Sequence, residues 1–368
     1  MATAESASPQ LATRRFAPAQ ILLWIFGTIL VVTVGVWLIR NAIDSPDRFL
    51  EVSLIGFTNG SIYALVALGY TLVYGIIELI NFAHGDNFML GTFQTNSIVN
   101  EGSFQIPLFP TTFVLALPLG AAAVASDSAA HRAYTIFMCL FWSMLFCMVI
   151  NVSIERFAYK PLRNQPRLVP LITAIGFSFI LQDVGLVWKG AGPQPLPNIL
   201  PTGDIFTWRE ASYGWNDFIV IAVTIPLLLA LTYLVRRTRS GKAMRATAQD
   251  MDASAMMGIN VDRTISFTFA LGGALAGAAG AIYALYVGTS KFDLGFRLGL
   301  FAFTAAVLGG IGNLTGAVVG GIILGLIQAY NEGFADARWT TTIIFGVLIL
   351  ILVFRPSGLL GEQVPEGQ

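Results

Sequence analysis

The sequence predicts an all-α polytopic membrane protein with about 8–10 transmembrane helices, some of them broken or re-entrant, and possible inverted repeats. Of its 368 residues, 55% are hydrophobic and only 11% are charged, and the mean hydropathy is +0.71. A soluble domain carries about 25% charged residues, so we expect lipid to be the main surrounding of this chain. Lys plus Arg and Asp plus Glu balance at 21 each, so no net charge favours a nucleic acid partner.

Long apolar runs mark the helices that could cross about 30 Å of hydrocarbon. In chain order they are roughly Ile21–Ile39, Val52–Ile77, Pro107–Ala125, Tyr134–Ile154, Leu168–Trp188, Phe218–Val235, Ile265–Val287, Leu300–Tyr330 and Thr340–Phe354. The first run is longer than a signal-peptide core and lacks a small-residue cleavage site. We therefore expect an uncleaved anchor after a disordered tail at 1–18, a transmembrane domain at 19–361 and a second tail at 362–368.

Positive charge in two loops predicts the orientation of the chain. Arg and Lys crowd residues 156–167 and again residues 236–263, so both loops should be cytoplasmic. Two spans and the segment Lys189–Asp217 separate these loops. That segment is rich in Pro, Gly and Trp and slightly acidic, and it should be periplasmic.

Two regions break the regular pattern of spans. The number of crossings agrees with the orientation only if Asn87–Gln105 adds no full crossing and Leu300–Tyr330 is a broken or re-entrant element. The second region contains Gly309, Gly310 and Gly312 and is too long for one straight span. Irregular backbone at membrane depth persists where protein or a water-filled path satisfies it, and in transporters it points to the substrate route.

A polar cluster of Glu78, Asn81, His84 and Asp86 ends the second apolar run. Ionisable groups inside a membrane are costly and usually functional, so we expect Asn81, His84 and Asp86 to meet Gly309–Gly316 near a translocation route. The alternative is a solvated helix end with a structural role. A metal site is not expected, because the chain has only two histidines and no ligand cluster around either.

Residues 236–263 contain a candidate amphipathic helix. In helical geometry Met244, Ala248, Met251 and Ala255 share one face, and Gly258 would stop the helix. Such a face could dock into a groove of a partner protein, or it could lie on lipid headgroups.

Other patterns concern packing and chemistry. Small residues at 272–280 and 316–321 allow helices to approach closely, either within one bundle or at a dimer seam. Cys139 and Cys147 would lie about 12 Å apart along one helix, too far for a disulfide. No P-loop, HExxH, GxSxG or CxxC motif occurs, so we expect no catalytic residue, metal or cofactor.

Four sequence blocks resemble the branched-chain amino acid ABC transporter permeases of the LivH type. They are GYTLVYGIIELINFAHGD at 69–86, IERFAYKPLR at 154–163, AVLGGIGNLTGA at 306–317 and RPSGLLG at 355–361. The blocks follow the family order from about Leu50 to Gly361. The resemblance implies a membrane translocation subunit and not an enzyme.

The same resemblance implies a role for the loop at 236–263. Permeases of ABC importers carry an E-A-A-x-x-x-G loop that couples to the ATPase, and DASAMMG at 252–258 is similar to it. Asp252 replaces Glu, Ser254 replaces the second Ala, and the usual downstream I-x-L-P is missing. Docking to an ATPase is therefore favoured over contact with headgroups, through Met244, Met251, Asp252, Ala253, Ser254 and Gly258.

The implied machine lies in the bacterial inner membrane. It combines this chain with two cytoplasmic ATP-binding subunits, a second related permease subunit and a periplasmic substrate-binding protein. The family suggests leucine, isoleucine and valine as substrates, whereas relatives carry urea, short-chain amides or other amino acids. A channel or secondary carrier would need no ATPase-docking loop. A membrane-embedded enzyme would need a cluster of ligands or a nucleophile–base pair, and none is visible.

Overall fold

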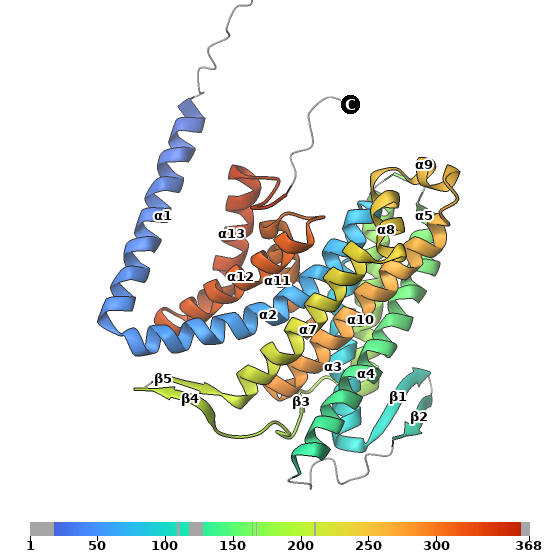
Figure 1. The fold of residues 1–368 in the computed structure, drawn as a ribbon, viewed down its shortest axis with the longest axis horizontal. Helices are drawn as coiled ribbons and strands as arrows, with labels where there is room; N and C mark the ends of the chain where they lie inside the picture. Colours follow the sequence, from blue (N-terminus) through green and yellow to red (C-terminus); the bar gives the residue numbers. More distant parts are fainter. Residues whose placement is uncertain are drawn as a thin grey trace, which may run out of the picture. The chain divides into compact units, whose positions relative to one another are not determined.

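The computed structural model describes residues 18–108, 111–117, 128–163, 165–166, 168–209 and 211–361, and the chain divides into two compact units, 1–49 and 50–368. The helices are α1 (Pro18–Asp44), α2 (Pro46–Ile77), α3 (Ala83–Glu101), α4 (Ala129–Ile154), the π-helical turn η2 (Glu155–Tyr159), α5 (Lys160–Leu162), α6 (Leu168–Lys189), α7 (Trp215–Arg237), α8 (Arg239–Gln249), α9 (Met251–Met256), α10 (Val261–Val287), α11 (Leu294–Gly309), α12 (Leu314–Phe334), the 3-10 turn η3 (Ala337–Trp339) and α13 (Thr340–Phe354). The strands form antiparallel pairs, β1 (Ser103–Leu108) with β2 (Thr111–Ala116), β3 (Gln194–Pro195) with β6 (Thr289–Ser290), and β4 (Asp204–Trp208) with β5 (Ala211–Gly214). Among the described residues, eight helices are long and apolar enough to cross a membrane, which confirms the predicted polytopic all-α class (Figure 1).

In the first unit, α1 contains the predicted first span. Its 27 residues, at a rise of 1.5 Å each, give a length of about 40 Å, which exceeds the hydrocarbon thickness. Apolar side chains such as Val31 and Ile43 are exposed along it, as a lipid-facing helix requires. The tails predicted at 1–18 and 362–368 lie outside the described residues, apart from Pro18, which begins α1.

In the second unit, α10 packs closely against α4 and α3 because small residues line its contacts. A Cβ atom on Gly273 would lie 2.5 Å from the carbonyl oxygen of Cys147 in α4. A Cβ atom on Gly280 would lie 2.5 Å from the carbonyl oxygen of Phe88 in α3. The small residues predicted at 272–280 therefore serve packing within one bundle. Both cysteines are buried and free, as expected.

The predicted span Pro107–Ala125 is wrong in its described part. Residues 103–108 and 111–116 form the β1–β2 hairpin, and residues 118–125 lie outside the described residues. The helix that precedes this hairpin is α3. It is buried at every residue from Ala83 to Val99 and packs against four other helices. The sequence obscured it because α3 is rich in polar side chains, which lower its hydropathy. Some of these side chains are satisfied locally: the Thr95 hydroxyl donates to the carbonyl of Gly91 at 3.0 Å.

The predicted break in Leu300–Tyr330 is confirmed. α11 and α12 form an antiparallel pair joined by residues 310–313, where Gly310 and Gly312 adopt φ values of 106° and 94°. The side-chain oxygen of Asn313 caps α12 by accepting from the backbone N–H groups of Thr315 and Gly316 at 3.0 and 3.1 Å. The last carbonyls of α11 accept from the backbone N–H groups of residues 359 and 360 at 2.8 and 2.9 Å. Protein groups thus satisfy the irregular backbone, as a membrane interior requires.

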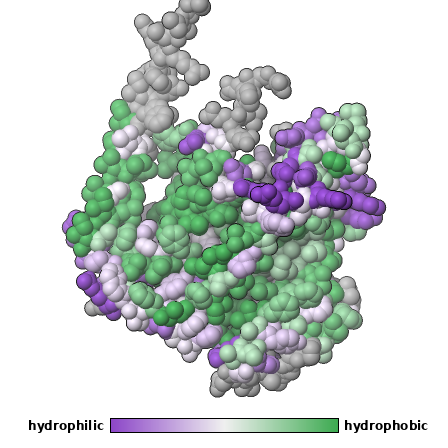
Figure 2. All heavy atoms as spheres, viewed as in Figure 1, coloured by the Kyte–Doolittle hydropathy of each residue, from purple (hydrophilic) through white to green (hydrophobic). Residues whose placement is uncertain are grey.

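The two basic loops lie at the same end of the bundle. The carboxylate of Asp262, at the start of α10, pairs with Lys160 at 2.7 Å and with Arg163 at 2.6 Å, which ties the loop at 156–167 to the loop at 236–263. Strands β3 to β5 lie at the opposite end, with Lys189–Asp217 (Figure 1). The displayed face is mostly hydrophobic, and hydrophilic residues gather at the end that carries α8 and α9 (Figure 2).

Candidate functional site

The candidate coupling segment, residues 239–258, consists of two helices. The predicted single helix is wrong, because Asp250 interrupts it with an extended backbone (φ −158°, ψ 113°). Its side-chain oxygen accepts from the backbone N–H of Ala253 at 2.8 Å and so caps α9. The competing local hydrogen bond of Asp250 ends α8 and begins α9. This aspartate, which the periodicity of the segment did not indicate, is the residue that gives the segment its bend.

The methionines of the segment therefore do not share one face. Met244 is buried at 2% exposure, and Met251 is 37% exposed. Met256 and Met257, which the amphipathic pattern did not single out, are 82% and 84% exposed and form an apolar tip at the end of α9. Exposed, adjacent large apolar side chains on a polar end of the protein are typical of a docking surface.

Gly258 ends α9 as predicted. Its φ of 84° lies in the left-handed region that glycine adopts at low cost. The backbone N–H of Gly258 donates to Ala255 at 3.0 Å, and that of Ile259 donates to Ser254 at 3.0 Å, which closes the helix end. Around the tip, Ser254 is buried, Ala253 is half-buried, and Asp252 is exposed in the first turn of α9.

Helix α8 is fixed to the end of α7. The Arg245 guanidinium donates to the carbonyl oxygen of Val235, which the α7 ladder leaves free. A Cβ atom on Gly241 would lie 2.2 Å from the same oxygen, so the two helices touch through their backbones. The hydroxyl of Thr238 accepts from the backbone N–H of Gly241 at 3.1 Å and caps α8. A displacement of α8 would therefore be passed to α7.

A buried ionic cluster lies beside this segment. Glu155, which is 1% exposed, accepts a hydrogen bond from the guanidinium of Arg163 and one from the hydroxyl of Ser266 at 2.7 Å. Arg163 also bonds Asp262, so the cluster joins η2 to the first turns of α10. Charges that share partners in this way hold the two loops in a defined arrangement.

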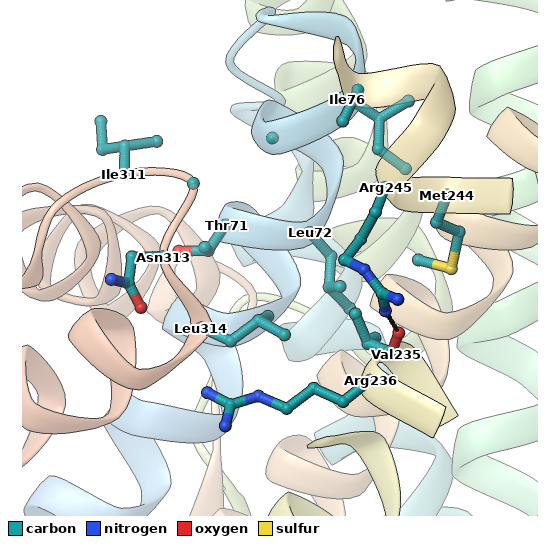
Figure 3. A pocket seen from close by; sticks show the side chains of 13 residues that line it. Thr71, Leu72, Ile76, Val235, Arg236, Met244, Arg245, Ile311, Asn313 and Leu314 are labelled. Carbon is teal, nitrogen blue, oxygen red and sulfur yellow. Dashed lines mark hydrogen bonds between the residues drawn. The ribbon is translucent and has the colours of Figure 1, made fainter. Parts of the chain in front are cut away.

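A cavity of about 530 Å³ lies between the coupling segment and the break at 310–313 (Figure 3). Its lining comes from α2 (Thr71, Leu72, Gly75, Ile76), from the end of α7 (Val235, Arg236), from α8 (Met244, Arg245, Ala248) and from residues Ile311 to Leu314. The guanidinium of Arg236 donates to the hydroxyl of Thr315 at 2.9 Å at its edge. Met244 and Gly312, predicted for coupling and for the pathway, thus line the same cavity.

The three predicted pathway glycines have different surroundings. A Cβ atom on Gly309 would lie 1.9 Å from the carbonyl oxygen of Gly316, and one on Gly310 would lie 2.4 Å from the backbone N of Gly361. Both positions are closed by backbone. Gly312 meets no atom within 4 Å and is open towards the cavity.

The predicted cluster at 81–86 is buried in the bundle. Asn81 donates from its side chain to that of Asn151 at 3.2 Å. The ring of His84 lies 4.8 Å from the ring of Tyr70, and Asp86 accepts from the hydroxyl of Ser178. All three side chains are enclosed by protein, at 0–2% exposure.

Within this cluster, Gly85 packs on the first half of α11: a Cβ atom on Gly85 would lie 2.7 Å from the Cα of Gly299. The meeting of Asn81, His84 and Asp86 with Gly309–Gly316 near a translocation route stays a prediction. The described ranges bring together no three His, Cys, Asp or Glu side chains that could hold a metal.

Comparisons with known proteins decide the family. Residues 53–353 match the family described as "Branched-chain amino acid transport system / permease component". The chain belongs to this permease family. The permease is 36% identical over 326 residues to the high-affinity branched-chain amino acid transport permease BraD of Pseudomonas aeruginosa. The aligned residues cover 87% of this chain and 98% of BraD. It is 38% identical over 323 residues to the high-affinity branched-chain amino acid transport permease LivH of Salmonella typhimurium. The aligned residues cover 86% of this chain and 97% of LivH.

A further relative has a different named substrate. The permease is 27% identical over 337 residues to the autoinducer 2 import permease LsrC of Yersinia pseudotuberculosis, covering 89% of this chain and 84% of LsrC. The family match begins at Ser53, after α1, and includes the cavity and the coupling segment. The permease is thus a multi-pass membrane transport component. All residues that line the 530 Å³ cavity lie within the part of the chain that matches the family.

Proposed function

We propose that the permease is a subunit of an ATP-driven ABC importer that moves leucine, isoleucine and valine across the bacterial inner membrane. The observation that carries this proposal is identity of 36% and 38%, over nearly the whole length, to two permeases named for high-affinity branched-chain amino acid transport. Identity to the autoinducer 2 permease is lower, at 27%. Urea, short-chain amides and other amino acids are the alternative substrates.

The proposed partners follow from two features of the chain: the absence of a P-loop motif in its sequence and the exposed apolar tip of α9. Its sequence has no P-loop, so the ATP-binding subunits would be two separate chains on the cytoplasmic side. The Met256–Met257 tip offers them an apolar contact. A second related permease subunit and a periplasmic binding protein would complete the importer. A channel or secondary carrier would have no use for such a tip.

The proposed mechanism is a rigid-body switch. Closure of the ATP-binding subunits on ATP would move α9, and α8 would follow because only Asp250 separates the two helices. Met244, Arg245 and Ala248 of α8 form one wall of the 530 Å³ cavity, and residues 311–314 form another. Moving α8 would therefore open or close the cavity at the cytoplasmic end. The permease would contribute no bond chemistry.

The test is transport by the complete importer in proteoliposomes. The permease, its partner permease, the ATP-binding subunits and the binding protein from one gene cluster are reconstituted together. We expect uptake of labelled leucine that requires both ATP and the binding protein and is inhibited by excess isoleucine or valine. Labelled urea, acetamide and glutamate serve as competing substrates. Leucine uptake without ATP, or a preference for one of those competitors, would refute the proposal.

A further inference from the structure

A second cavity, of about 320 Å³, lies at the end of the bundle opposite the coupling segment. Tyr286, near the end of α10, lines it and donates a hydrogen bond to Asp217 at 2.9 Å. Asp262 begins the same helix beside the coupling segment, and 24 residues at 1.5 Å each place the two positions about 36 Å apart. In the predicted orientation this cavity faces the periplasm.

One cation and one anion line this cavity without pairing with each other. Arg297 comes from α11 and Glu332 from α12, and the described residues offer no ion pair between them within 4.0 Å. Among those residues Arg297 also has no hydrogen-bond partner. Tyr63 and Tyr283 line the same cavity beside these two groups. The cavity therefore presents two opposite charges to an entering molecule.

A hydrogen-bond chain positions the anion. The hydroxyl of Tyr63, which is buried, donates to the side-chain oxygen of Gln328 at 2.5 Å. The amide nitrogen of Gln328 then donates to Glu332 at 3.0 Å. The carboxylate also accepts from the hydroxyl of Thr340 at 3.4 Å, and both bonds go to the same oxygen, Oε1. The described partners thus leave Oε2 as the oxygen that a ligand can bond.

One part of the remaining wall is apolar and aromatic, beside the polar side chains of Asn59 and Thr341. Leu298 and Phe301 of α11 line the cavity, and the ring of Phe301 packs edge-on against Tyr63 at 6.3 Å and against Phe345 at 6.3 Å. A free α-amino acid carries an ammonium and a carboxylate on one carbon, beside its side chain. A cation, an anion and an apolar wall in one small cavity match those three parts.

We propose that this cavity is a binding site for a free α-amino acid with an apolar side chain. Arg297 binds the α-carboxylate, Glu332 binds the α-ammonium through Oε2, and the wall of Leu298 and Phe301 receives the side chain. The inference rests on the proposed function for the class of substrate. It deepens that function by giving the permease a site of its own, in addition to that of the binding protein. Uncharged urea would use neither charge.

The experiment measures equilibrium binding of labelled L-leucine to the complete permease complex in nanodiscs, without ATP and without the binding protein. We expect saturable binding that falls about tenfold or more in Arg297→Gln and in Glu332→Gln, since each removes a charge-assisted hydrogen bond. Arg338→Gln is the matched control, because Arg338 is exposed, pairs with Asp336 at 3.2 Å and does not line the cavity. Size-exclusion profiles of all variants report folding.

Two leucine analogues assign the charges. Leucinamide lacks the carboxylate, so its binding should respond to Glu332→Gln and not to Arg297→Gln. 4-Methylpentanoate lacks the ammonium, so its binding should respond to Arg297→Gln alone. Unchanged leucine binding in both variants, an equal loss in Arg338→Gln, or impaired docking of the binding protein with leucine binding intact would overturn the proposal. So would the absence of saturable leucine binding to a wild-type complex that transports leucine.

Failure of this inference is distinguishable from failure of the proposed function. ATP-driven leucine transport that is unchanged in both variants overturns the site and leaves the proposed function standing. A wild-type complex that transports no branched-chain amino acid overturns the proposed function itself.

Discussion

A Cβ atom on Gly277 of α10 would lie 2.2 Å from the carbonyl oxygen of Ser143 in α4. No side chain separates the two helices at this point, and the oxygen belongs to backbone that cannot rotate away. The hydroxyl side chain of Ser143 and the thiol side chain of Cys147 in α4 are both buried at 0% exposure. A side chain at position 277 would therefore have to force α4 and α10 apart.

The first prediction concerns this contact. Gly277→Leu should destabilise the bundle by ~3 kcal/mol, because inserting a side chain forces the helices apart. The measurement is the melting temperature of the purified permease in detergent, followed by size exclusion. Gly176→Leu is the matched control, since a Cβ atom there meets nothing within 4 Å. Equal melting temperatures for the two variants would contradict the prediction.

The sequence predicted the bundle well wherever one local signal was sufficient. The break at 310–313 was visible because three glycines interrupt a run too long for one span, and Gly258 was visible because a glycine ends a helix. Helix α3 was missed because hydropathy measures an average, whereas its polar side chains are satisfied by neighbours that the sequence does not reveal.

The sites were less predictable than the fold. The bend at Asp250 could have been found, because aspartate is a preferred N-cap residue whose side chain accepts from the backbone N–H three residues later, here that of Ala253. The two cavities could not. Thr71, Met244 and Gly312 meet in one, and Tyr63, Arg297 and Glu332 in the other, only after α2, α8, α11 and α12 have packed.

The second prediction concerns the exposed tip of α9. Replacing both Met256 and Met257 by Glu should reduce the amount of ATP-binding subunit that copurifies with the permease by about tenfold, because charges would enter an apolar contact. Leucine uptake should fall in parallel. The matched control replaces both residues by Leu, which keeps the apolar contact and should retain uptake. Normal association in the double Glu variant would exclude the tip from docking.

The third prediction concerns orientation. Single cysteines replace the exposed residues Arg239, at the start of α8, and Thr207, in β4, in a background of Cys139→Ala and Cys147→Ala. In intact spheroplasts a membrane-impermeant thiol reagent should label position 207 and leave position 239 unlabelled, because the basic loops are predicted to be cytoplasmic. Opening the membrane with detergent should make position 239 reactive. Labelling of position 239 before detergent treatment would reverse the topology.

The last prediction concerns the cavity shared by the coupling segment and the break at 310–313. Ala248 is exposed on α8 and lines this cavity, so Ala248→Trp places an indole inside it. Leucine uptake should fall about tenfold, equivalent to ~1.4 kcal/mol in the transport barrier. Copurification and ATP hydrolysis should persist, because Asp250 and the tip of α9 are unchanged.

Gln249→Trp is the matched control: Gln249 is the next residue of the same helix, it is exposed, and it does not line the cavity. Uptake retained in Ala248→Trp would place the substrate route elsewhere. Equal loss in both variants would attribute the defect to α8 itself and not to the cavity.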